Sequence, residues 1–224
     1  MAIVLLAAAA LLARRGAVLV AGIHEEKPEY VVVLDAGHGG DDPGKIGIHG
    51  EKEKDINLSV VKKLKTLLEQ NDVTVVLTRE TDESLADAGV SNQKVCDMRK
   101  RVELIAEVQP DLVVSIHQNS YTQESVCGAQ CFYYAQAQDG KRLAEILQEN
   151  MKTYLNPENH REAKENETYY LLKRTVSPTV IVECGFLSND AEATLLSTEE
   201  YQDRVAWAVC MGVLQCLNEL YPTR

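Results

Sequence analysis

The feature that most limits the fold of this chain is a regular alternation of short apolar runs with stretches of helical period. The first run, at 30–34, is rich in β-branched residues, as in a strand buried on both faces. Further strands are expected at 73–77, 112–116, 130–134 (an edge strand by its alternation) and 179–182, and helices at 55–70, 97–108, 141–154 and 199–220. Strands and helices in this order predict an α/β fold, a single three-layer domain with a mostly parallel twisted sheet and helices on both faces.

The amino terminus departs from this pattern. Residues 3–13 are apolar, and the pair Arg14 and Arg15 follows them. A run of that length fits the core of a signal peptide better than a membrane span, which needs about 20 residues. The alternative is a misplaced start, with the arginine pair as the true charged region before a short apolar run. We expect 1–27 to be a signal peptide or N-terminal anchor, through which alone the protein would touch a membrane, and 28–224 to form one domain.

Charge and cysteine content narrow the classes of partner and of site. The net charge is −11, and the sequence has no basic patch with interleaved aromatic residues. A nucleic-acid partner is therefore not expected, because phosphate binding requires such cations. Six cysteines are present, but no two lie in a CxxC pair, which argues against a structural zinc site made of cysteines. Most of them are expected to be small buried residues.

Four side chains that can serve a metal site each lie next to a short apolar run or at the start of a predicted helix. They are His38, Glu53, His117 and Glu183. Two imidazoles and one carboxylate form the ligand set of a catalytic zinc ion, and a further carboxylate can act as the base for its water. Because functional groups gather at the carboxyl ends of parallel strands, these distant segments are expected to meet at one edge of the sheet. The sequence therefore predicts metal-assisted hydrolysis.

Each of these residues also has a plain structural interpretation. His38 could be an ordinary histidine of a glycine-rich loop, and His117 could be hydrogen-bonded core lining. Glu53 competes with Glu51, because both lie near the start of a helix, where an acidic residue favours the helix dipole, and periodicity does not choose between them. Glu183 follows a buried strand, where an unpaired charge is costly, so that function explains it better than packing does.

The chain resembles the zinc-dependent N-acetylmuramoyl-L-alanine amidases of the bacterial cell wall (the Amidase_3 type) over most of 30–220. The motifs that carry the resemblance are LDAGHGGDDPG, EKDINL, VVLTRETD, MRKRVELI, DLVVSIHQN and VIVECGFLSN, in that order. The resemblance implies a Zn²⁺ cofactor with His38, Glu53 and His117 as its ligands, which favours Glu53 over Glu51. It also implies that Glu183 is the catalytic residue and that 28–224 is the catalytic domain.

Within this family, the compact single domain and the leader look most similar to the CwlD-type amidases that act on the peptidoglycan of the spore cortex. This resemblance implies hydrolysis of the amide between N-acetylmuramic acid and L-alanine, as a step toward the muramic δ-lactam. It further implies export to the cell envelope or to the space between the forespore and mother-cell membranes. Other cortex-modifying enzymes or an activating protein are the partners that it suggests.

Two other functions are compatible with the residues. A zinc peptidase that cuts a stem-peptide bond would use the same four side chains, and product analysis of digested peptidoglycan would separate it from an amidase. A non-catalytic wall-binding module could keep the fold, but the presence of all four side chains disfavours it.

Overall fold

The computed structural model describes residues 30–222. The expected signal peptide or anchor at 1–27 lies outside these residues. Within the described part of the chain, no helix combines the length and the apolar character needed to cross a membrane.

A six-stranded sheet forms the centre of the domain, with the strand order β2-β1-β3-β6-β4-β5. Its strands are β1 (Tyr30–Ala36), β2 (Val73–Leu77), β3 (Leu112–Asn119), β4 (Gln130–Tyr133), β5 (Lys164–Glu165) and β6 (Thr179–Phe186). The strands β2, β1, β3 and β6 run parallel to one another, whereas β4 pairs antiparallel with β6 and parallel with β5. The expected α/β fold with a mostly parallel sheet is thus confirmed.

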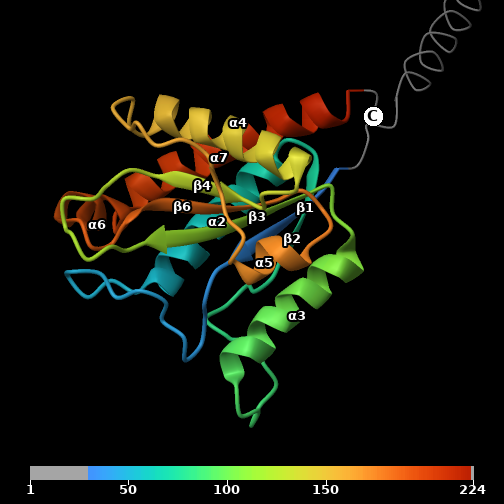
Figure 1. The fold of residues 1–224 in the computed structure, drawn as a ribbon, viewed down its shortest axis with the longest axis horizontal. Coiled ribbons are helices and arrows are strands. Elements are labelled where there is room, and N and C mark those ends of the chain that lie inside the picture. The colour runs from blue at the N-terminus through green and yellow to red at the C-terminus, as the bar shows by residue number, and fades with distance from the viewer. Residues whose placement is uncertain (1–29, 223–224) are drawn as a thin grey trace, which may run out of the picture. The chain divides into compact units, whose positions relative to one another are not determined.

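Helices cover both faces of this sheet (Figure 1). They are α2 (Glu53–Glu69), α3 (Gln93–Val108), α4 (Gln138–Tyr154), α5 (Tyr170–Arg174), α6 (Asp190–Leu196) and α7 (Glu199–Leu220). On one face α2 and α4 pack on the strands and α7 packs against both of these helices. On the other face α3 packs against α5 and β1. The three layers expected from the sequence are therefore present.

Strand β1 shows why a continuous apolar run suits the middle layer. Val32 and Leu34 belong to the large core beneath α2, α4 and α7, whereas Val33 between them belongs to the smaller core beneath α3. Successive side chains on a strand point to opposite faces, so both faces must be apolar wherever helices cover both. The same alternation directs Asp35 and the side chains aligned with it toward the α3 face.

Some elements differ from those expected. α3 begins at Gln93, earlier than predicted, because the Asn92 side chain accepts a hydrogen bond from the Val95 amide and caps the helix there. The strand expected at the sheet edge, β4, has the two-residue β5 beyond it. The elements α5, α6 and β5 were not predicted, since they span only seven residues or fewer.

All six cysteines lie in the described residues and are free thiols. Five of them are buried and Cys127 is exposed, which confirms the expectation that most cysteines fill core positions.

Candidate active site

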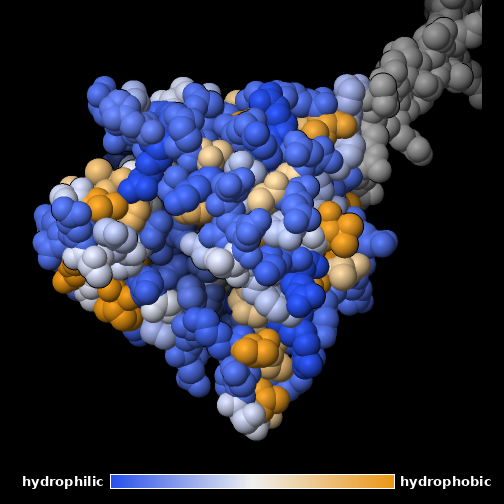
Figure 2. Space-filling model, viewed as in Figure 1, coloured by the Kyte–Doolittle hydropathy of each residue, from blue (hydrophilic) through white to orange (hydrophobic). Residues whose placement is uncertain are grey.

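A cavity of about 430 Å³ opens on the α3 and α5 side of the sheet, at the carboxyl ends of β1 and β3. The four residues expected to form a site, His38, Glu53, His117 and Glu183, all line it. Figure 2 shows a hollow near the middle of a largely hydrophilic face. The structure therefore brings together side chains that lie as much as 145 positions apart in the sequence (183 − 38).

Three of the four side chains form a compact cluster around the carboxylate of Glu53. The His38 Nε2 atom lies 3.2 Å from Glu53 Oε2, and the His117 Nδ1 atom lies 2.9 Å from Glu53 Oε1. One potential ligand atom from each residue lies within 4.8 Å of the other two. The two imidazole rings meet edge to face, with their centroids 5.1 Å apart.

His38 is held in an unusual backbone conformation. Its φ is 64°, in the left-handed region that residues other than glycine rarely adopt. Its carbonyl oxygen accepts a hydrogen bond from Arg101 Nη2 at 2.7 Å, and its Nδ1 atom lies 2.9 Å from Asp42 Oδ2. These two contacts fix the ring so that Nε2 points into the cluster.

Two glycines make room for the cluster. A Cβ atom on Gly37 would lie 2.3 Å from His117 Nε2, closer than real atoms approach. Gly44 has a φ of +69°, and a Cβ atom there would lie 2.6 Å from Glu53 Oε2 and 2.7 Å from His38 Cδ2. Both positions therefore require glycine for space, and Gly44 also requires it for its backbone.

The start of α2 places Glu53, and not Glu51, in the cluster. The amide of Glu53 donates to the Lys45 carbonyl at 3.0 Å, and its Oε2 accepts from the Lys45 amide at 2.8 Å. The Gln118 amide donates to its Oε1 at 3.1 Å. Glu51 Oε2 instead accepts from the His49 amide, in the loop before the helix.

The electrostatics of the cluster keep Glu53 ionised. Burial alone would raise its pKa, but hydrogen bonds from His117 and His38 outweigh this and hold the pKa of Glu53 far below its ordinary value. Burial in turn disfavours a charged His117, yet the adjacent Glu53 carboxylate raises the pKa of His117 above its ordinary value. A carboxylate held in its ionised form next to two imidazoles favours a cation at this place.

A buried ionic network supports the cluster from behind. The guanidinium of Arg101 pairs with Asp35 and Asp97, at 2.5 and 2.6 Å, and also donates to the Ala36 carbonyl at 2.8 Å. Burial alone would raise the pKa of Asp35, but the charge of Arg101 and hydrogen bonds from nearby hydroxyls lower it to about 2. Arg101 also donates to the His38 carbonyl, so that Asp35 supports the site through this network.

Glu183 lies beside the cluster without joining it. It is paired in register with His117 on the adjacent parallel strand, and the side chain is 7% exposed. Its Oε2 atom has no hydrogen-bond partner among the described residues. Burial raises the pKa of Glu183 to about 7, although the charge of His117 acts in the opposite direction. A buried carboxylate that titrates near neutral pH suits a general base.

Asn119 ends β3, two positions after His117. It lines the cavity, but its Oδ1 atom accepts a hydrogen bond from the Ser120 amide, and the pairing of β3 with β6 shifts register between His117 and Asn119. The sequence did not single out Lys45, Lys94 or Tyr169 as site residues, although all three line the same cavity. They carry no distinguishing motif, and only the folded chain brings them to the site.

The residues present fit a divalent metal ion. Two imidazole nitrogens and a carboxylate oxygen are the donor set of catalytic zinc sites, which keep a further position open. The contact of His38 with Asp42 is the kind of outer interaction that orients a metal-binding imidazole. Glu183, whose Oε2 atom is buried and has no hydrogen-bond partner among the described residues, lines the cavity next to this donor set.

Comparison with known proteins agrees with this geometry. Residues 32–215 match the family model described as N-acetylmuramoyl-L-alanine amidase. The germination-specific N-acetylmuramoyl-L-alanine amidase of Bacillus subtilis is 37% identical over 193 residues, which cover 84% of this chain and 80% of that protein.

Solved structures show the same relationship. The CwlD amidase from Clostridioides difficile, solved in complex with the GerS lipoprotein, is 39% identical, with a TM-score of 0.83 over 85% of this chain and all of that one. The amidase AmiC2 of Nostoc punctiforme is 30% identical, with a TM-score of 0.75 over 85% of this chain and 98% of that one. These matches support the amidase over the peptidase and the non-catalytic module that the residues alone left open. The chain belongs to the N-acetylmuramoyl-L-alanine amidase family, and it is an enzyme of that class.

Proposed function

We propose that this chain is a zinc-dependent amidase in which His38, Glu53 and His117 hold the ion and Glu183 is the catalytic base. The observation that carries the proposal is the compact His–Glu–His cluster with an unpartnered buried carboxylate beside it. The bond cleaved is the amide between the lactyl carboxyl group of N-acetylmuramic acid and L-alanine.

In this proposal three side chains bind the ion and the fourth, Glu183, transfers protons. When bound, zinc supplies Lewis-acid chemistry, since it makes water more acidic and polarises a carbonyl group. Glu183 accepts a proton from the attacking water and delivers it to the departing alanine nitrogen. In the metal-free protein burial raises the pKa of Glu183 above its ordinary value, so this carboxylate holds a proton more readily than an exposed one does.

We also propose that the substrate is the peptidoglycan of the spore cortex and that the product is a precursor of the muramic δ-lactam. Support comes from the identity of 37% with the germination-specific amidase and of 39% with the CwlD amidase. On this proposal the enzyme acts outside the cytoplasm, in the cell envelope or between the forespore and mother-cell membranes, and 1–27 serves its export or anchoring.

A protein partner is part of the proposal. The solved CwlD amidase is in complex with the GerS lipoprotein, and it is similar to this chain over the whole of its own length. An activating or anchoring protein of that kind, or another cortex-modifying enzyme, is therefore a candidate partner for this chain.

The test combines metal analysis with product analysis. The purified full chain is expected to contain one zinc ion and to release stem peptides with a free L-alanine terminus from cortex peptidoglycan, detected by mass spectrometry. His117→Ala should lose the zinc, and Glu183→Gln should keep it while losing about 10²-fold or more in rate. Shortened stems would instead indicate a peptidase, and an active Glu183→Gln would remove that residue from the mechanism.

A further inference from the structure

Tyr169 is a firmly positioned side chain of the cavity that the mechanism above leaves unused. Its ring meets Phe132 edge to face, with a centroid distance of 5.6 Å. Phe132 on β4 is paired in register with Ile181 on β6, and these two residues belong to the apolar cluster against which Tyr169 packs. Glu183 follows Ile181 by two positions on β6, so both point to the same face of the sheet.

The backbone around Tyr169 is equally well fixed. The Oδ1 atom of Asn166 accepts hydrogen bonds from the amides of Thr168 and Tyr169, at 2.7 and 2.8 Å. The amide of Asn166 donates in turn to the carbonyl of Tyr133 on β4 at 2.8 Å. Tyr169 then caps α5, and its carbonyl accepts from the Lys173 amide. The phenol is therefore held on the sheet at both its ring and its main chain.

The hydroxyl group of Tyr169 is free for a ligand. Among the described residues it has no hydrogen bond or ion pair, although the residue is half-buried and lines the cavity. Burial and the nearby carboxylates of Glu183 and Glu53 raise the pKa of Tyr169 to about 12. The hydroxyl group thus keeps its proton at neutral pH and can donate it in a hydrogen bond.

We propose that the Tyr169 hydroxyl donates a hydrogen bond to the carbonyl oxygen of the scissile amide as negative charge builds up on it. The inference rests on the proposed function and adds a residue to that site. The proton stays on Tyr169 throughout, so that no bond to this residue forms or breaks. A preorganised donor aimed at a developing oxyanion is worth about 10²- to 10³-fold in rate, and a half-exposed one beside a metal site should be worth less.

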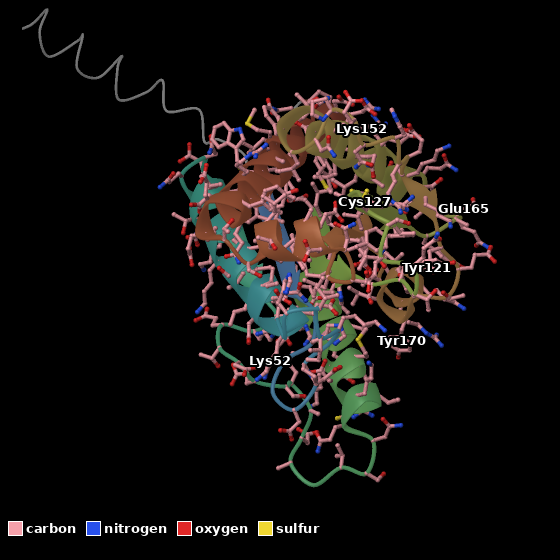
Figure 3. The ribbon with its side chains drawn as sticks, turned by 90° about the vertical axis from the view of Figure 1, so that its left-hand side faces the viewer. Lys52, Tyr121, Cys127, Lys152, Glu165 and Tyr170 are labelled. Atoms are coloured by element: carbon pink, nitrogen blue, oxygen red, sulfur yellow. The ribbon has the colours of Figure 1, made fainter. Side chains whose placement is uncertain are left out.

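The test removes this hydroxyl group alone. In the zinc-loaded full chain acting on a soluble muropeptide, Tyr169→Phe is expected to lower kcat by about 10- to 100-fold while KM changes less than about twofold. Zinc content and melting temperature should match the parent, since the ring and its packing remain. Tyr121→Phe is the matched control, because Tyr121 is 57% exposed and lies outside the cavity lining (Figure 3).

A binding measurement gives a second readout. A phosphinate analogue of the amide, which carries the charge of the tetrahedral state, should bind Tyr169→Phe more weakly by the same factor as the loss in kcat. A kcat within threefold of the parent, or a loss confined to KM, would overturn the proposal. So would a shift of the acidic limb of the pH profile, because Tyr169 would then act through Glu183.

The role of Tyr169 and the zinc mechanism on which it rests can be rejected separately. An inactive Glu183→Gln together with a fully active Tyr169→Phe would reject the role of Tyr169 and keep the zinc mechanism. A protein without zinc, or an active Glu183→Gln, would reject the mechanism whatever Tyr169→Phe does.

Discussion

Glu183 and His117 are register partners on adjacent parallel strands, and the carboxylate of Glu183 is buried with one oxygen unpartnered among the described residues. Such a group is costly to the fold in its charged form, because an ionised carboxylate without hydrogen bonds is poorly solvated. A feature that suits catalysis should thus lower the stability of the metal-free protein.

Glu183→Gln is accordingly expected to stabilise the metal-free protein at high pH. The pKa of Glu183 is raised to about 7 from an ordinary 4.5, so the folded state holds the proton more tightly and loses stability as the pH rises through this window. At pH 8 the variant should gain up to about 3 kcal/mol in the free energy of unfolding, and at pH 4 it should match the parent. Urea unfolding in the presence of a chelator measures the free energy of unfolding of the parent and of the variant at each pH. Equal free energies for the two proteins at pH 8 would contradict the expectation.

Asp42→Asn should weaken zinc binding by about 10- to 100-fold. The amide keeps the oxygen that accepts from the Gly44 backbone, but it removes the charge next to His38 Nδ1. Competition with a chromogenic chelator gives the affinity. Asp41→Asn is the matched control, since Asp41 is exposed and has no hydrogen bond or ion pair among the described residues. Equal affinities for the two variants would exclude a role for Asp42 in orienting His38.

Gly44→Ala should abolish tight metal binding. The new methyl group would displace the Glu53 and His38 side chains, from which it would be only 2.6 and 2.7 Å away. Gly89→Ala separates this effect from backbone strain, because Gly89 has a similar φ of +79° but no atom within 4 Å of its Cβ position. Both variants should lose about 1–2 kcal/mol of stability from the left-handed backbone, and zinc titration should fail for Gly44→Ala alone. If Gly89→Ala lost zinc as well, crowding would not be the cause.

Asp35→Asn should destabilise the protein by about 3 kcal/mol at neutral pH, because it leaves the buried Arg101 without one of its partners. The loss should shrink as the pH falls. The pKa of Asp35 in the folded protein, about 2, lies below its ordinary 3.8, so its contribution is present above pH 4 and disappears as the pH falls through 2. Chemical denaturation of both proteins at pH 7 and pH 3 in chelator tests this. A difference in stability that did not depend on pH would contradict it.

The sequence predicted the elements that have a clear apolar pattern and missed the short helices and the two-residue strand. The bounds of β2 (Val73–Leu77) and α7 (Glu199–Leu220) match the prediction, because apolar period and length both mark them. The helix Tyr170–Arg174 was missed, since a single turn carries no measurable period. Its start depends on the side chain of Asn166 and on pairing with β4, which are tertiary contacts.

In the candidate site, too, the sequence pattern predicts some residues, whereas others depend on tertiary contacts. The position of His117 at the end of a buried run pointed to the sheet edge where the structure has it. Glu53 could be separated from Glu51 only by family resemblance, because the choice depends on hydrogen bonds between α2 and Lys45 that no local pattern predicts. Tyr169 reaches the site through packing between distant segments, so its spacing in the sequence carries no signal. Arg101 lies in one of the family motifs, but its contacts with Asp35 and the His38 carbonyl exist only in the folded chain.

The exposure of the six thiols allows the protein to be labelled at a single site. Cys127, labelled in Figure 3, is the exposed one of the six. Among the buried thiols, burial raises the pKa of Cys210 to about 11 and that of Cys216 to about 12, which leaves little reactive thiolate at neutral pH. A maleimide fluorophore or a spin label should therefore attach at one defined point of the unmodified chain. Spectroscopy of the enzyme on its natural polymer would then need no engineered cysteine background.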